Sequence, residues 1–350
     1  MEIQQKINRL LSISTKKDIA DKLQQKLSGK QDFIAIHPLE PSVRFNYLQA
    51  LQYVAASRAV TECGGKYILF ISDIKAQQNL AFNLNDELIQ TASNYAVAIL
   101  KELGVCGPNI EIVKSSELSL NAEMFFDMVQ NSIKVSVQDV QNTLQVPKNS
   151  KEVQTASKYI SPCLQATEMI HLKADIVITT VSSEAQFSLI EKFSPDNVPV
   201  IIPMLDILNL KPNQPRLDLN NNFYVEDDLA VLKKKANSAF CTDDISNNPI
   251  FISLALLIEA NGEFVLGEKK YNDVEAATAD FAAMDKKSLK EAIANAIFIA
   301  TQKVAETVKG NEELTKISGE MIASMNPKKA VPPKKTKKQN PKQQKPQQNK

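Results

Sequence analysis

The chain has 350 residues, more than most single domains, so we expect two packed units with appended segments. Its hydrophobic fraction of 43% and charged fraction of 23% lie near globular averages and exclude a mainly disordered chain. Residues 1–30 lack the continuous apolar core of a signal peptide, and no run is long enough to cross a membrane, which predicts a cytoplasmic protein. The cysteines form no Cys-x-x-Cys pair, which argues against a zinc site, and all are expected to be buried thiols: Cys63, Cys106, Cys163 and Cys241.

The net charge of +1 conceals an uneven distribution of charge along the chain. Residues 327–350 contain nine lysines and no acidic residue, which leaves 32 basic and 40 acidic residues, a net charge of −8, for the rest. A basic arm on an acidic body is typical of contact with RNA or another polyanion. A tail that only aids solubility is the alternative, and both interpretations predict disorder. The lysines that would contact RNA are Lys328, Lys329, Lys334, Lys335, Lys337, Lys338, Lys342, Lys345 and Lys350.

From the N-terminus, apolar residues at helical spacing predict helices within residues 1–30. A short strand at Phe33–Ile36 follows, and then a helix over residues 44–63 for which Ser42 is a plausible N-cap. A strand at Tyr67–Ile71 and a helix at Asp86–Leu103 repeat this order. The alternation of buried strands and helices indicates parallel pairing.

Three further strands are predicted at residues 110–113, 175–179 and 198–202. Between the last two, a helix is expected to open at Ser183, with Gln186 completing a capping box. Together these elements predict an α/β protein with a Rossmann-like, doubly wound parallel sheet covered on both faces.

Residues 116–159 read as a polar helical insertion whose apolar residues are Phe125, Phe126, Met128 and Val129, and helices dominate again from residue 228. We predict N-terminal helices at 1–30, a catalytic-type domain at 31–210 with an insertion at about 114–160, a loop at 211–227, a helical bundle domain at 228–325 and a disordered basic tail at 326–350.

In an open parallel sheet, ligands bind at the carboxyl ends of the strands. A phosphate cradle at the first strand-to-helix turn needs glycines, because backbone N–H groups must approach the anion closely. The turn at residues 37–45 contains none, and the whole chain has only nine.

Several motifs in this order resemble class I aminoacyl-tRNA synthetases of the archaeal and eukaryotic tyrosyl type. Residues 40–49 are similar to the family's Glu-Pro-Ser-Gly turn and His-x-Gly-His signature, and Phe70–Ala76 to its Leu-Ala-Asp-Leu-His-Ala strand end. Pro162–Gln165 with Leu172–Asp175 resembles Tyr-Pro-x-Met-Gln and the strand after it, and residues 233–241 resemble the entry to the anticodon-binding domain. The resemblance runs from about residue 33 to 308.

The departures fall on positions that perform adenylation in the family. Asn46 and Gln49 replace the two histidines that would donate to the ATP phosphates, and Leu48 replaces the glycine against which adenine would lie. The mobile Lys-Met-Ser-Lys-Ser loop falls on residues 213–217, where only Arg216 is a cation. The signature positions are therefore degenerate, and we assign no catalytic residue and no metal site.

A remnant of the amino acid pocket is also implied by the resemblance. Gln165 and Asp73 are retained, whereas the pocket's Tyr and Asp become Ser161 and Glu168. The Gly-x-Asp-Gln-x-Lys stretch falls on residues 180–185, so Ser182 and Ser183 also belong to the remnant. Asp73 at a strand end is more commonly a capping or turn residue than a ligand, and Gln165 is expected to satisfy nearby backbone.

Three functions remain open from the sequence. The leading one is a catalytically impaired pseudo-synthetase that binds tRNA or other RNA and forms a homodimer, or a heterodimer with an active relative, through the insertion. The second is an active tyrosine–tRNA ligase in a divergent lineage, which would use ATP and magnesium. The third is a structural subunit that ignores RNA.

Overall fold

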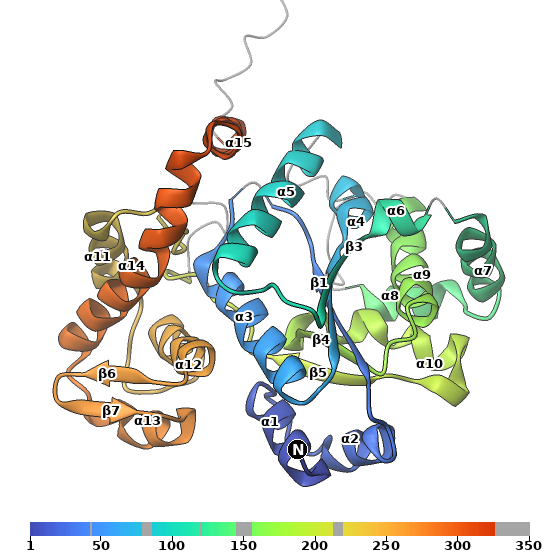
Figure 1. Ribbon diagram of the computed structural model, residues 1–350, viewed down its shortest axis with the longest axis horizontal. Helices are drawn as coiled ribbons and strands as arrows, with labels where there is room; N and C mark the ends of the chain where they lie inside the picture. Colours follow the sequence, from blue (N-terminus) through green and yellow to red (C-terminus); the bar gives the residue numbers. More distant parts are fainter. Residues whose placement is uncertain (43, 79–85, 120, 145–155, 213–219, 326–350) are drawn as a thin grey trace, which may run out of the picture.

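The protein is described by a computed structural model that covers residues 1–42, 44–78, 86–119, 121–144, 156–212 and 220–325. Five parallel strands form its central sheet in the order β3-β2-β1-β4-β5 (Figure 1). The order reverses between β1 and β4, which makes this the switch point of a doubly wound sheet. The predicted fold class is therefore confirmed. The strands are β1 Ile34–Leu39, β2 Lys66–Ile71, β3 Ile110–Lys114, β4 Ile176–Thr180 and β5 Val200–Met204.

The side chains of the strands alternate between two hydrophobic clusters, as the two-residue period of a β-strand requires. Ile36, Phe70 and Val177 face one cluster, and Ala35 and Leu69 face the other. Helices α3 (Tyr47–Glu62) and α5 (Asp86–Glu102) pack on the second face. Helices α9 (Ala156–His171) and α10 (Leu189–Phe193) pack on the first (Figure 1). Both faces are covered, which is why the strands read as continuous apolar runs.

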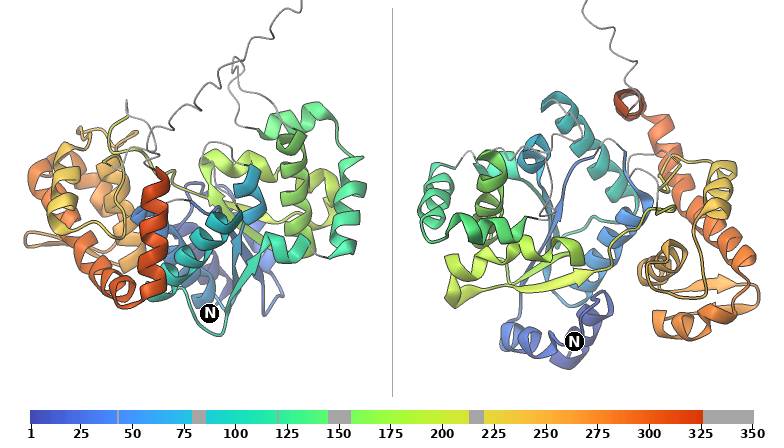
Figure 2. Two further views of the ribbon diagram at one scale, coloured as in Figure 1. Left: turned by 90° about the horizontal axis from the view of Figure 1, so that it is seen from above. Right: turned by 180° about the vertical axis from the view of Figure 1, so that it is seen from behind.

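Residues 220–325 form a mainly helical region on one side of the sheet, opposite α7 (Figures 1 and 2). Its helices are α11 Leu229–Ser238, α12 Pro249–Asn261, α13 Val274–Asp280, η4 Phe281–Ala283, α14 Lys286–Gly310 and α15 Glu312–Met325. A short antiparallel hairpin, β6 (Phe264–Leu266) and β7 (Lys269–Tyr271), was not predicted. Helix α15 returns to pack against α5.

The remaining elements lie at the N-terminus and around the sheet. They are α1 Ile3–Ser12, α2 Ala20–Leu27, α4 Asp73–Gln78, α6 Ser115–Ser119, α7 Ala122–Ser132, α8 Val137–Thr143, η2 Val181–Phe187 and η3 Pro195–Asn197. Among the helices described here, none is both long and apolar enough to cross a membrane. We retain the predicted domain boundaries, including the insertion at about 114–160, as a proposal.

Several local predictions were wrong. Helix α3 begins at Tyr47 with Asn46 as its N-cap, while the Ser42 hydroxyl donates to the Arg44 carbonyl within the preceding turn. Residues 181–187 form a 3-10 helix with no side-chain cap, and Gln186 instead accepts a hydrogen bond from Lys75, so the capping box is absent. Of the four cysteines, Cys106 is exposed.

Candidate functional site

The carboxyl ends of β1, β2 and β4 lie at the switch point, where this fold class binds ligands. The first polar groups at this edge belong to α3. Asn46 caps the helix, because its side-chain oxygen accepts from the Leu48 N–H at 2.9 Å, and its amide nitrogen donates to Asn222 at 2.9 Å. The Tyr47 N–H donates to the Phe223 carbonyl at 2.9 Å. The two N–H groups that open α3 are therefore satisfied from within the chain.

The other two signature positions on α3 face the interior of the protein. The side chain of Leu48 is 2% exposed and belongs to the main hydrophobic core. Gln49 is half-buried one turn before Tyr53, whose hydroxyl donates to the Pro38 carbonyl at 2.9 Å. Both side chains are thus part of the packing between α3 and β1.

Lys75 on α4 lies between the segments that follow β1 and β4 at this edge of the sheet. Its ammonium group donates to Gln186 at 2.8 Å and pairs with Glu40 at 3.5 Å. These two partners follow β4 and β1, the strands on either side of the switch point. An internal polar bridge therefore spans the position at which a ligand would enter.

Asp73 is the first residue of α4, and its carboxylate hydrogen-bonds within the chain. Its carboxylate accepts from the N–H groups of Ile74 at 3.0 Å and Ser116 at 2.9 Å, and from the Ser116 hydroxyl at 2.5 Å. The side chain is buried and ties the ends of β2 and β3 together.

Glu168 on α9 is the most deeply buried acid of the predicted pocket, at 1% exposure. The hydroxyl of Ser115 donates to its carboxylate. Burial raises its pKa from 4.5 to about 8, the Ser115 hydrogen bond lowers it, and the charge of Asp73 raises it further. At neutral pH this group is therefore largely a protonated acid held inside the protein.

The remaining pocket positions are divided between α9 and the segment after β4. Gln165 is buried on α9 beside Glu168, and Ser161 lies half-buried one turn earlier. Ser182 is exposed and Ser183 is half-buried, and the backbone N–H and hydroxyl of Ser182 donate to Asp206. The structure brings Asp73 and Glu168 together, but Ser182 turns toward the end of β5.

The chain resembles plant tyrosine–tRNA ligases in sequence. No protein-family model matches the chain. "Tyrosine--tRNA ligase 2, cytoplasmic" of Arabidopsis thaliana is 23% identical over 316 residues, covering 83% of this chain but only 42% of that protein. "Tyrosine--tRNA ligase 1, cytoplasmic" of the same plant is 23% identical over 330 residues and matches 88% and 86% of the two chains.

Two solved tyrosyl-tRNA synthetase structures have the same fold as this chain. The tyrosyl-tRNA synthetase of Aeropyrum pernix superposes with a TM-score of 0.84 at 16% identity, covering 92% of this chain and all of that one. The enzyme of Archaeoglobus fulgidus, complexed with L-tyrosine, gives 0.78 at 19% identity, covering 91% and 100%. The chain is thus similar in sequence and in fold to class I tyrosyl-tRNA synthetases.

Sequence reasoning missed the charged cluster that joins the two halves of this synthetase-like chain. Arg44 pairs with Glu226 at 2.9 Å and Asp227 at 3.7 Å, and Lys235 pairs with Asp227 at 2.5 Å. Both cations lie over the ring of Tyr224, at 4.0 Å and 4.7 Å. In the sequence, the acidic run at residues 224–228 and the three lysines at 233–235 indicate a charged segment. They do not indicate that Arg44 is the partner of Glu226 and Asp227.

His37 on β1 is one of the two histidines of the chain. His37 is buried, its Nδ1 lies 3.0 Å from the Tyr67 hydroxyl, and its ring lies 4.2 Å from that of Tyr53. Burial lowers its pKa to about 3, so the imidazole is neutral. It is a packing residue of the synthetase-like sheet and offers no charge to a phosphate.

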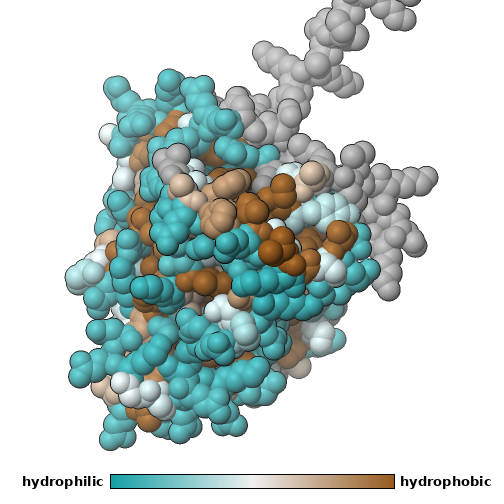
Figure 3. All heavy atoms as spheres, turned by 90° about the vertical axis from the view of Figure 1, so that its right-hand side faces the viewer, coloured by the Kyte–Doolittle hydropathy of each residue, from teal (hydrophilic) through white to brown (hydrophobic). Residues whose placement is uncertain are grey.

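The insertion of this synthetase-like protein carries an exposed apolar face. Phe125 and Phe126 on α7 are 57% and 59% exposed, and Val129, Ile133 and Val137 continue the patch (Figure 3). Met128 was predicted to belong to it but is only 8% exposed and packs into the core with Met124. The spacing of α7 explains the correction, because residues 124 and 128 lie one turn apart on the opposite stripe.

Two groups of predicted site residues lie outside the described residues. Arg216, in the position of the family's mobile loop, falls in the gap at 213–219, and the RNA-contacting lysines fall in 326–350. Their assignments stay predictions.

Proposed function

We propose that this protein is a catalytically impaired pseudo-synthetase that binds tRNA or other RNA and a partner subunit. The observation that supports impairment is the start of α3. An α-helix attracts phosphate at its N-terminus because its first N–H groups lack partners. Here the Tyr47 N–H already donates to Phe223 and the Leu48 N–H to Asn46. The carbonyl of Phe223 would also repel an anion placed there.

The side chains at the same positions support this proposal. Asn46 and Gln49 are both neutral, and the side-chain amide of Asn46 already donates to Asn222 inside the protein. Loss of a single donor to a developing charge typically costs about 2.7–4 kcal/mol of transition-state stabilisation. Leu48, buried in the core, takes the place of the signature glycine.

An active tyrosine–tRNA ligase using ATP and magnesium is the second candidate. Retention of Asp73 and Gln165 at the pocket favours it, together with a fold that covers whole archaeal synthetases. Against it, Asp73 already accepts three hydrogen bonds from Ile74 and Ser116, and Lys75 links Glu40 and Gln186 at the ends of β1 and β4.

Tyrosine-dependent exchange between pyrophosphate and ATP decides between the two. We expect no exchange above background from the full-length chain, with the Archaeoglobus fulgidus enzyme as positive control. Exchange at a rate comparable to that control would overturn the impairment and establish the ligase.

The binding part of the proposal rests on charge and exposed apolar surface. The body of the chain is acidic, so the lysines of residues 327–350 are its natural contact with a phosphate backbone. The exposed face of α7 is the natural contact for a second subunit, either another copy or an active relative. We place the protein in the cytoplasm, as the names of the plant relatives state for those proteins.

Native mass measured with RNA content tests this part. A dimer that carries RNA supports the proposal. A dimer that is indifferent to RNA would identify a structural subunit instead.

A further inference from the structure

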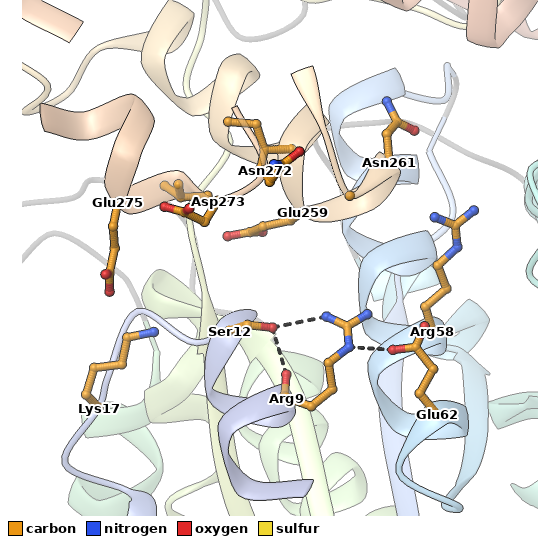
Figure 4. A pocket seen from close by; sticks show the side chains of 13 residues that line it. Arg9, Ser12, Lys17, Arg58, Glu62, Glu259, Asn261, Asn272, Asp273 and Glu275 are labelled. Atoms are coloured by element: carbon orange, nitrogen blue, oxygen red, sulfur yellow. Dashed lines mark hydrogen bonds and ion pairs between the residues drawn. The ribbon is translucent and has the colours of Figure 1, made fainter. Parts of the chain in front are cut away.

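Charged side chains line a cavity of about 460 Å³ between the N-terminal helices and the helical region (Figure 4). Glu62 pairs with Arg9 at 2.5 Å. Burial raises the pKa of Glu259, and the charges of Lys17 and Arg9 lower it, so these cations already act on an acid across the cavity. The acids outnumber the cations, which are Arg9, Lys17 and Arg58 against Glu62, Glu259, Asp273 and Glu275. The cavity therefore offers no surplus positive charge to an anionic partner.

A second charged region lies where the C-terminal end of α11 meets the start of α14, two helices that pack against each other (Figure 1). We call it the α11–α14 surface and define it by residues 233–244 and 285–291. Its exposed and half-buried charged residues are five lysines and four acids, a net charge of +1, whereas residues 1–326 as a whole carry −8. The surface is thus positive relative to the rest of the body. These residues are Lys233, Lys234, Lys286, Lys287, Lys290, Asp243, Asp244, Asp285 and Glu291.

Two of these lysines pair with acids of the same surface. Lys233 lies 3.1 Å from Glu291, and Lys286 lies 3.2 Å from Asp243. The other two acids each accept a backbone N–H group, one at the start of α14 and one in the loop before α12. The lysines that form no ion pair among the described residues are Lys234, Lys287 and Lys290.

Lys290 brings a positive charge to the end of α11. Its ammonium group donates to the carbonyl of Ala239 at 2.7 Å and to that of Asn237 at 3.3 Å. Both acceptors are neutral, so Lys290 keeps its charge and has a further N–H donor for a phosphate oxygen. Lys234, Asn237 and Ser238 are all exposed on α11 and, being three and four residues apart, lie on the same face of the helix.

Phe240 directly follows the residue to which Lys290 donates, and its side chain is 42% exposed. Among the aromatic side chains of the described residues, the exposed ones are Phe240 and the two on α7. The backbone N–H of Phe240 donates to the Leu210 carbonyl at 2.7 Å, which fixes this residue against the chain that follows β5. An accessible ring beside an unpaired ammonium group is the combination on which unpaired bases stack.

We propose that the α11–α14 surface binds single-stranded RNA, with one unpaired base stacked on Phe240 and the neighbouring phosphates against Lys290 and Lys234. This inference rests on the RNA binding proposed above and adds a contact on the body of the chain to that of the tail. Asn237 and Ser238, exposed beside Lys234, supply amide and hydroxyl donors for the sugar or the base edge.

The exposed ring favours an unpaired strand over a duplex. In a duplex the bases stack on one another and present only their edges, so they cannot cover a protein ring. A protein partner is the other possible occupant of Phe240. RNA is favoured because the lysines without an acid partner lie on the same surface as the ring.

Binding of the full-length chain to a short single-stranded RNA, and to a duplex RNA with the same number of phosphates, tests the proposal. Phe240→Tyr keeps an aromatic ring, whereas Phe240→Leu keeps an apolar side chain without one. We expect Phe240→Leu to bind the single strand about tenfold more weakly, with an unchanged salt slope. Phe240→Tyr should bind like the unmodified chain, and duplex binding should be the same for all three proteins.

Lysine variants test the phosphate contacts. Lys290→Gln and Lys234→Gln should each lower the logarithmic salt slope for the single strand by about 0.7. Lys101→Gln is the matched control, because Lys101 is exposed on α5 in the sheet domain, and its slope should not change. Thermal unfolding verifies that each variant is folded.

Two failures of the experiment are distinguishable. If the unmodified chain binds RNA and a folded Phe240→Leu protein binds the single strand equally well, or loses single-strand and duplex binding alike, the α11–α14 surface is not the stacking site and RNA binding by the tail still stands. If the unmodified chain binds neither RNA, the proposed RNA-binding function itself is wrong.

Discussion

The guanidinium group of Arg44 lies 2.9 Å from the carboxylate of Glu226, and this pair joins the turn after β1 to the chain that leads into α11. The two side chains are only 10% and 16% exposed. Tyr95 of α5 and Ser318 of α15 also donate to Glu226. One partly buried acid therefore connects the sheet domain with both ends of the helical region.

Replacement of Arg44 by Met should destabilise the protein by about 3–5 kcal/mol, because Glu226 would remain buried without its cation. Urea denaturation measures the loss. Lys66→Met is the matched control, since the Lys66–Glu111 pair is about half-exposed on both sides and should contribute less than about 1 kcal/mol. Equal effects of the two substitutions would contradict a structural role for the cluster.

Glu168→Gln should change how stability depends on pH. The pKa of Glu168 is about 8 in the folded protein and 4.5 without burial, so between these values the folded state holds a proton that the unfolded state releases. Stability from this group is full below about pH 4.5 and is lost as the pH rises toward 8. Each unit of pKa difference corresponds to about 1.4 kcal/mol.

Glutamine mimics the protonated acid and can still accept from Ser115, so the variant should match the unmodified protein at pH 5 and exceed its stability at pH 8. Urea denaturation at several pH values provides the comparison. Some slope should remain, because burial also raises the pKa of Glu259 to about 7. Glu117→Gln is the control, because the Glu117 side chain on α6 is exposed, and an identical pH slope for both variants would refute the assignment.

Phe125→Asp combined with Phe126→Asp should convert a dimer into a monomer. Both side chains are more than half exposed, so the substitution removes an interface without disturbing the core, and thermal unfolding of the monomer should change little. Sedimentation measures the mass. Met128→Glu should behave differently and unfold the insertion, because it would place a charge in the core. An unmodified protein that sediments as a monomer at micromolar concentration would end the dimer proposal.

Deletion of residues 327–350 should weaken RNA binding and flatten its dependence on salt. Each lysine–phosphate contact on a single strand contributes about 0.7 to the logarithmic slope. Binding of single-stranded RNA and of tRNA at several salt concentrations measures both quantities. Unchanged affinity and slope would leave the tail with solubility as its role.

The sheet could be predicted from sequence because its five strands are buried on both faces and read as apolar runs. The start of α3 could not, because Ser42 and Asn46 are both good cap residues and only the three-dimensional contact with Asn222 selects Asn46. The hairpin β6–β7 was missed because its strands have three residues each, too few for an alternating pattern.

For the candidate site, the sequence shows which signature residues are replaced. It does not show which side chains lie next to one another at the ends of the strands. Lys75 meets Gln186 from 111 positions away, and Ser115 meets Glu168 from 53. Arg44 and Glu226 are separated by 182 positions. Pairings at such separations are set by how the helices pack on the sheet, and no local pattern encodes them.

The burial of the Arg44 cluster gives the protein two classes of charge that respond differently to ionic strength. Surface charges are screened over roughly 8 Å at physiological salt, whereas buried pairs are screened much less. Added salt should thus release a bound polyanion while the helical region keeps its orientation on the sheet. The RNA binding that we propose for residues 327–350 would then depend on salt far more strongly than the contact between the sheet and the helical region.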